Sequence, residues 1–185
     1  MASAIRLAST ADVEQLQTLE LAAGQLFRQF DMAEVAAHPP PSQAVFRRYI
    51  ELGQSWVLTD TAANSLAGFV LVDVVDGCAH IEQLSVHPAF SGRRLGAQLI
   101  EQVLQWARVQ QLQALTLTTF LEVPWNAPYY QRCGFRVLES TQLTPGLVEI
   151  RAHEGQLGLD AWPRVCMRRE LSKANALLGG VFDGN

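Results

Sequence analysis

The sequence predicts one α/β (α+β) domain, built on a mixed, mostly antiparallel sheet of six to seven strands that is flanked by helices. Segments 55–59, 66–75 and 79–86 have the apolar composition and turn spacing of consecutive strands, with a tight hairpin signal at Asp76-Gly77. Apolar residues then recur at helical spacing from about Gly92, before a further strand-like segment, 114–119. A strand, a helix and a strand in this order place their two strands side by side and parallel.

The N-terminal part supplies a strand and two helices. Segment 4–7 alternates as a strand does, and Ser9 begins a helix through a variant capping box. The proline-rich segment 38–41 interrupts regular structure, because proline has no amide donor. Ser42 caps the second helix and Gly53 ends it. Helical spacing places three residues on the buried face of this second helix: Val45, Tyr49 and Leu52.

The C-terminal part supplies the remaining elements. A short helix is predicted from Pro124 to Arg132 and stops at Gly134, followed by a strand over 135–138. The spacing of apolar residues over 147–157 indicates one more helix, and 165–171 a last strand.

Length and charge limit the classes of partner. The 185 residues suffice for one domain with its own core. We assign residues 1–172 to this domain and expect a flexible tail over 173–185, which shows no clear period. The 14 basic and 18 acidic side chains give a formal charge of −4, so no general positive field attracts nucleic acid or anionic lipid. The sequence shows neither a secretion signal nor an apolar segment that could span a bilayer. We expect a cytoplasmic protein with no nucleic-acid or membrane partner.

The cysteines and histidines do not indicate a metal site. Cys78, Cys133 and Cys166 are odd in number and widely spaced, which predicts buried free thiols. The histidines show no ligand-like spacing, and the HExxH pattern is absent. We therefore predict no bound metal.

The segment from Val86 to Ala97 is a strand that turns through small residues into a helix. Such a turn presents backbone amides at the positive end of the helix dipole, which suits an anion. Arg93 and Arg94 oppose that dipole by roughly 0.3 to 1 kcal/mol each, and a bound polyanion would reverse this cost. A glycine turn with solvated arginines explains the segment equally simply when it is taken alone.

A second segment, from Val123 to Phe135, follows the strand at 114–119 and reads VPWNAPYYQRCGF. In their order and separation, the two segments together resemble the acyl-coenzyme A segments of the GNAT superfamily of N-acetyltransferases. The resemblance extends over about residues 55–138. It implies the GNAT-like sheet, in which the two parallel strands splay apart, and a cleft for acetyl-coenzyme A (acetyl-CoA) between them.

The family's Q/R-x-x-G-x-G/A pyrophosphate loop corresponds here to residues 91–96. Ser91 replaces the usual Gln or Arg and Arg94 the first Gly, whereas the final Gly is present. The resemblance also implies that pantetheine lies against the backbone of the strand that ends at Val86. The residues implied in coenzyme binding are Leu84, Ser85, Val86, Ser91, Gly92, Arg93, Arg94, Leu95, Gly96, Ala97 and Asn126.

The second segment resembles the family's N-x-x-A-x-x-Y-x-x-x-G-F ending, with Gly134-Phe135 at its close. Tyr130 then corresponds to the tyrosine beside the coenzyme sulfur, and the resemblance implies that it protonates the departing thiolate. An aromatic packing residue is the structural alternative. For the base that takes the amine proton, directly or through water, Glu82 is the first candidate and Glu122 the second, with an ordered water as a further possibility. Either carboxylate could instead lie on the surface without a chemical role.

The resemblance implies direct acetyl transfer from acetyl-CoA to a primary amine of a small molecule or a peptide, and it allows a homodimer. Two alternatives stay open. One is a non-catalytic acyl-CoA-binding module that reports acyl supply. The other is a nucleotide-binding or nucleic-acid-modifying domain that uses the Arg93-Arg94 turn, against which the missing phosphate-loop motifs and the acidic charge both argue.

Overall fold

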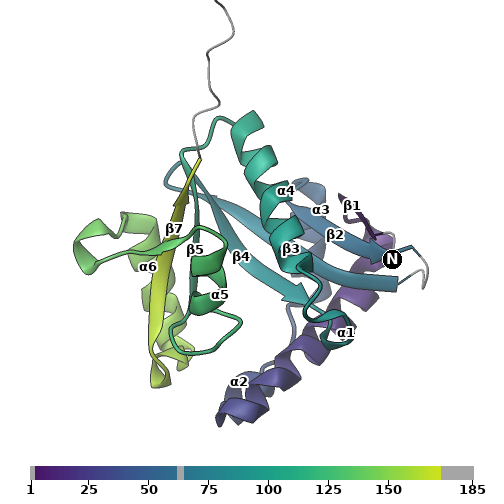
Figure 1. Ribbon diagram of the computed structural model, residues 1–185, viewed down its shortest axis with the longest axis horizontal. Coiled ribbons are helices and arrows are strands. Elements are labelled where there is room, and N and C mark those ends of the chain that lie inside the picture. The colour runs from purple at the N-terminus through teal and green to yellow at the C-terminus, as the bar shows by residue number, and fades with distance from the viewer. Residues whose placement is uncertain (1–2, 62–64, 172–185) are drawn as a thin grey trace, which may run out of the picture.

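A computed structural model describes residues 3–61 and 65–171 of the chain. Its strands form a single mixed sheet in the order β1-β2-β3-β4-β5-β7-β6, and only the β4–β5 pair is parallel (Figure 1). This arrangement confirms the predicted fold class. The strands are β1 Ser3–Leu7, β2 Ser55–Asp60, β3 Ser65–Val75, β4 Cys78–Val86, β5 Ala114–Phe120, β6 Arg136–Val137 and β7 Arg164–Glu170. The tail expected over 173–185 lies outside the described residues.

Helices cover both faces of the sheet. They are α1 Val13–Gly24, α2 Ala33–Ala36, α3 Gln43–Glu51, α4 Leu95–Val109, α5 Ala127–Arg132 and α6 Pro145–Gln156. One face packs against α4 and α5, in a core that includes Leu99, Val103 and Tyr130. We call this face the α4 face. The other packs against α1 and α3, with α6 over β7, and we call it the α1 face.

The parallel pair is short. Only Ala79–Ile81 of β4 pair with Leu115–Leu117 of β5. Beyond this ladder β4 continues beside β3 and β5 beside β7, so the two strands diverge toward their carboxyl ends. The expected splay is therefore present, and it lies beside the two segments that resemble the coenzyme-binding segments of the family, 86–97 and 123–135.

A β-bulge interrupts β4 at this divergence. Leu71 of β3 pairs with Gln83, but the next residue, Val72, pairs with Ile81, so Glu82 is the extra residue. A bulge resets the alternation of side chains along a strand. Consequently Glu82 and Gln83 both belong to the α1 face, whereas Leu84 returns to the α4 face.

Three details of the helices differ from the sequence prediction, and the first is that α5 begins at Ala127 rather than at Pro124. The buried face of α3 consists of Phe46 and Tyr49, while Val45 and Leu52 are exposed. A four-residue step from Phe46 also reaches Ile50, so the true stripe is shifted by one residue, and the Phe46 ring packs edge-on against Phe69 of β3. The third difference is the start of α4.

Helix α4 begins at Leu95 rather than near Gly92. The 3-10 turn Pro88–Phe90 ends at Ser91, and Gly92 and Arg94 then have positive φ angles, of 77° and 57°, which a right-handed helix does not allow. The apolar residues that recur at helical spacing all lie within α4: Leu95, Leu99, Val103, Trp106 and Val109. Among the described residues, no helix is long and apolar enough to span a membrane.

Candidate active site

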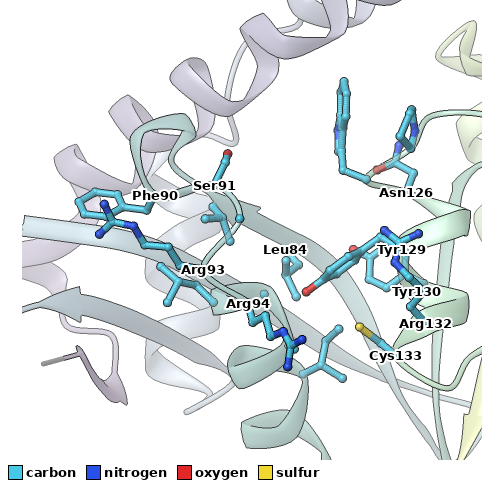
Figure 2. A pocket seen from close by; sticks show the side chains of 18 of the residues that line it. Leu84, Phe90, Ser91, Arg93, Arg94, Asn126, Tyr129, Tyr130, Arg132 and Cys133 are labelled. Atoms are coloured by element: carbon cyan, nitrogen blue, oxygen red, sulfur yellow. The ribbon is translucent and has the colours of Figure 1, made fainter. Parts of the chain in front are cut away.

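A cavity of about 930 Å³ lies on the α4 face, between the end of β4, the start of α4 and helix α5 (Figure 2). Its size is in the range of small-molecule sites in proteins. Ten of the eleven residues that the resemblance implied in coenzyme binding line it: Leu84, Val86, Ser91, Gly92, Arg93, Arg94, Leu95, Gly96, Ala97 and Asn126. Segments far apart in the chain thus form one site.

The turn before α4 presents the helix N-terminus to this cavity. The first backbone hydrogen bond of the helical turn runs from the Gln98 amide to the Arg94 carbonyl, at 3.3 Å. The preceding amides are therefore those that a helix leaves for an external acceptor. Arg94 has φ 57° and ψ 25°, a conformation that a glycine would adopt without strain. The loop thus keeps a backbone geometry typical of glycine at the position where the family pattern has one.

The guanidinium of Arg93 lies over the Phe90 ring, with Cζ 5.4 Å from the ring centroid. Both residues line the cavity. The loop therefore brings a positive charge and an aromatic surface to the same end of the site as the helix N-terminus.

The hydroxyl of Tyr129 leaves no room for a side chain at Gly96. A Cβ atom at this position would lie 2.7 Å from the hydroxyl oxygen of Tyr129, too close for any side chain. That hydroxyl also interacts with the Ala97 amide and with the thiol of Cys133. Figure 2 shows the Tyr129 ring extending from α5 toward the α4 side of the cavity. Burial raises the pKa of Tyr129, so its hydroxyl keeps its proton.

Tyr130 lines the same cavity and is 8% exposed. Its ring packs edge-on against Tyr129 and Phe135, with centroids 5.7 Å away in both cases. Burial raises the pKa of this phenol. The hydroxyl is therefore protonated at neutral pH, and the ring is held among other aromatic rings. Tyr130 thus lines the cavity, as a general acid would, and also packs against its aromatic neighbours.

Glu82 lies on the opposite, α1 face of β4, directly after the last parallel pair. Of its side-chain surface, 48% is exposed, and Oε2 is 4.0 Å from Nε2 of His80. Desolvation by the surrounding protein raises the pKa of Glu82, and the charges of Asp73 and Glu154 act in the same direction. This carboxylate therefore lies at the divergence of β4 and β5, on the side of the sheet away from the cavity.

Two other residues predicted for the site, Glu122 and Ser85, lie outside the cavity. Glu122 is exposed just beyond the end of β5 and does not line the cavity. Ser85 is buried on the α1 face, where its hydroxyl donates to Glu20 at 2.5 Å. A backbone contact from Ser85 to a coenzyme stays a prediction.

Polar side chains line the α1 face around Glu82. The Tyr49 hydroxyl donates to Asp73 at 2.5 Å, and Nδ1 of His80 lies 3.0 Å from the Thr116 hydroxyl. On the β5 side of the divergence, Thr118 donates a hydrogen bond to Glu154 of α6. Burying polar groups is unfavourable unless they bond to one another, and these bonds meet that need.

Several residues of the site carry no signal in the sequence. Leu26 and Trp125 line the cavity because the N-terminal 3-10 turn Gln25–Phe30 packs beside the loop before α5. The Trp125 ring contacts Phe27 and Phe30, with centroids 5.6 and 5.0 Å apart. Cys133, expected to be buried, is half-buried and lines the cavity, whereas Cys78 and Cys166 are buried as predicted. Within residues 3–61 and 65–171, no cluster of His, Cys, Asp and Glu could hold a metal ion.

A model of the acetyltransferase (GNAT) family matches residues 21–135, which is more than half of the chain. That range includes the turn before α4, helix α5 and the bulge of β4. The family match therefore covers the cavity and the carboxylate described above.

Solved structures have the same fold. PaiA N-acetyltransferase from Thermoplasma acidophilum, in complex with coenzyme A, is 14% identical, with a TM-score of 0.66 over 92% of this chain and 99% of that one. The ribosomal-protein-S18-alanine N-acetyltransferase from Escherichia coli is 18% identical, with a TM-score of 0.62 over 96% and 99%. Rv2747 from Mycobacterium tuberculosis, in complex with CoA and NLQ, is 19% identical, with a TM-score of 0.65 over 91% and 99%.

Proposed function

The chain belongs to the acetyltransferase (GNAT) family, and on that premise we propose that it transfers an acetyl group directly from acetyl-CoA to a primary amine. One observation carries the proposal. Where β4 and β5 diverge, a large cavity lies on one face of the sheet and the carboxylate of Glu82 on the other. A thioester in the cavity and an amine beside Glu82 would meet through that opening.

The coenzyme is proposed to lie in the 930 Å³ cavity. Amides at the start of α4 would bind its pyrophosphate, since helix N-termini favour anions. Arg93 and Arg94 add positive charge at the same place. Two of the compared structures contain coenzyme A, which supports this assignment.

The backbone of β4 is suited to orient the pantetheine and thioester. Parallel pairing with β5 stops at Ile81, so the edge of β4 that faces β5 leaves the ladder there. An extended ligand can take up the backbone hydrogen bonds of such an edge. A donor near Leu84 would also stabilise the negative charge that develops on the carbonyl oxygen during attack.

Glu82 is proposed as the base. An acceptor amine is mostly protonated at neutral pH and must lose a proton before or during attack. The raised pKa of Glu82 makes its carboxylate a better proton acceptor than an ordinary one. Tyr130 is proposed as the acid that protonates the departing thiolate, because its phenol is protonated and lines the cavity.

The proposed acceptor is a primary amine of a small molecule or a peptide. The compared E. coli structure is named for alanine of a ribosomal protein, which is a reason to include peptide amines in the test. The acceptor would approach over the α1 face, where Glu82 is accessible.

The test is a single-turnover assay with purified protein, labelled acetyl-CoA and a panel of small amines and peptides, with the acetylated product identified by mass spectrometry. We expect a product with at least one amine. Glu82→Gln should reduce the rate about 100-fold, whereas Glu149→Gln, an exposed carboxylate on α6, should not change it. Glu122→Gln tests the second candidate for the base. Acetyl-CoA binding without a product from any amine would contradict the proposal and favour an acyl-CoA-binding module.

A further inference from the structure

The structure assigns a positioning role to His80: we propose that its imidazole, held by Thr116, directs an Nε2–H at the carboxylate of Glu82 and thereby orients that carboxylate toward the acceptor amine. The inference rests on the proposed function, in which Glu82 removes the amine proton. It concerns a residue that does not itself touch the reacting atoms.

The sheet brings the three side chains together. His80 and Thr116 are paired residues of the parallel ladder, and their side chains meet on the α1 face. Glu82 follows two residues later as the extra residue of the bulge, which keeps it on that face. The chain Thr116–His80–Glu82 thus crosses from β5 to β4 at the divergence of the strands.

Hydrogen bonding selects the tautomer of His80. The ring is 1% exposed, and Nδ1 lies 3.0 Å from the Thr116 hydroxyl. If that hydroxyl donates to Nδ1, the proton is on Nε2 and faces Glu82. The opposite tautomer would place a nitrogen lone pair 4.0 Å from a carboxylate oxygen, which is unfavourable. Burial lowers the pKa of His80 to about 4, so the ring is neutral at pH 7.

Glu82 needs such a partner, because its surroundings do not fix it. With 48% of its side-chain surface exposed, packing leaves the carboxylate free to rotate. Among the described residues, we find no other hydrogen bond or ion pair from this carboxylate. The 4.0 Å separation is longer than a direct hydrogen bond, and catalytic hydrogen bonds commonly shorten only in the substrate complex.

Other charged groups also act on Glu82 and must stay constant in a test. From the elements packed around it these are Asp73 of β3, His153 and Glu154 of α6 and Arg164 of β7, with Tyr49 of α3 nearby. None of them is altered in the variants below, so a change in the titration of Glu82 can be assigned to His80.

Two substitutions distinguish the roles of the two ring nitrogens of His80. In His80→Gln the amide nitrogen stands in for Nε2 and keeps a donor toward Glu82. In His80→Asn it stands in for Nδ1 and keeps a partner for Thr116 only. Both are uncharged and polar, so they form a matched pair.

The experiment measures the pKa of Glu82 by ¹³C NMR of its carboxyl carbon, assigned with Glu82→Gln, and the pH profile of kcat/KM for acetyl transfer. In His80→Asn we expect the pKa of Glu82 to rise, because its charged form loses a donor. The ascending limb of the profile should move to higher pH, and kcat should fall about tenfold with KM for acetyl-CoA unchanged. His80→Gln should stay close to the wild type in each respect.

An identical Glu82 titration in the wild type and both variants would overturn the proposal. If the Asn variant does not fold, His80→Leu replaces it, since it removes both ring nitrogens, including the donor toward Glu82, and keeps an apolar side chain in the buried position. The same rise in the pKa of Glu82 is then expected, and its absence is equally decisive. Full activity of Glu82→Gln would instead refute the base assignment, while the NMR titration would still report on His80.

Discussion

Two neighbouring tyrosines of α5 meet the cavity in different ways. The Tyr129 hydroxyl is engaged with the Ala97 amide and the Cys133 thiol, at the start of α4. Tyr130 is more deeply packed, between the rings of Tyr129 and Phe135. Because the Tyr129 hydroxyl is already engaged with the first turn of α4, Tyr130 is the better candidate for proton transfer.

We expect Tyr130→Phe to lower kcat for acetyl transfer about 100-fold, the typical contribution of a general acid. The ring and its packing are retained, so KM for acetyl-CoA and the thermal midpoint should stay near the wild-type values. Steady-state kinetics with a good acceptor and thermal unfolding check these expectations. Wild-type turnover by the variant would show that Tyr130 only packs the site.

The buried His80 predicts a pH dependence of stability. Its pKa is about 4 in the folded protein, against about 6.5 in an unfolded chain. Between these values the unfolded chain binds a proton that the folded one does not, so stability falls as the pH drops from 6.5 to 4. The loss from this group is about 3 kcal/mol. Urea unfolding of the wild type and His80→Gln over this range should show the weaker pH dependence in the variant, and equal dependence would exclude a neutral buried His80.

At the scale of elements, the turn before α4 adopts a conformation that its sequence does not favour. Arg94 is in the left-handed region, which costs a non-glycine residue about 1 to 2 kcal/mol. The loop nevertheless has the geometry that places the helix N-terminus in the cavity. The rest of the fold overcomes the local preference of this residue.

Relief of the left-handed conformation is worth about 1 to 2 kcal/mol, and the entropy that a glycine loses on folding costs about 0.5 to 1 kcal/mol, so Arg94→Gly should stabilise the protein by up to about 1 kcal/mol. Arg93→Gly is the matched control: it removes the same charge beside the helix dipole, but Arg93 is not among the residues with positive φ, so this variant should be less stable than Arg94→Gly. Urea unfolding of the two variants measures the difference. A lower unfolding midpoint for Arg94→Gly than for Arg93→Gly would show that the Arg94 side chain stabilises the loop more than its backbone strain destabilises it.

The sequence predicted the helices and strands better than the contacts between them. Alternation and helical period indicated the strands, the parallel pair and α4, because these patterns depend on which residues are buried. The face of α3 was wrong because Phe46, one position from the chosen stripe, fits against Phe69. Segment 79–86 gave no warning that Glu82 is an extra residue, since a bulge depends on the partner strand. Likewise, Trp125 reaches the cavity through contacts with Phe27 and Phe30, from another part of the chain.

At the scale of the whole molecule, the sheet separates the two proposed roles, coenzyme binding and deprotonation of the amine. The α4 face forms the cavity and the turn before α4, and the α1 face presents Glu82 with its polar neighbours. The divergence of β4 and β5 joins the two faces. Coenzyme binding should therefore not depend on the acceptor side, and Glu82→Gln should bind acetyl-CoA as the wild type does.

This separation predicts a selective thermal shift. A ligand at 100 times its dissociation constant adds about 2.7 kcal/mol, which for a chain of this size raises the midpoint by roughly 5 to 11 °C. Acetyl-CoA should produce this shift in both the wild type and Glu82→Gln, because the cavity residues are unchanged in the variant. ATP and NADH are controls, since they carry phosphates but no pantetheine to lie along β4. An equal shift with ATP would mean that Arg93 and Arg94 recognise phosphate alone, and a shift that disappears in Glu82→Gln would mean that the two faces are not independent.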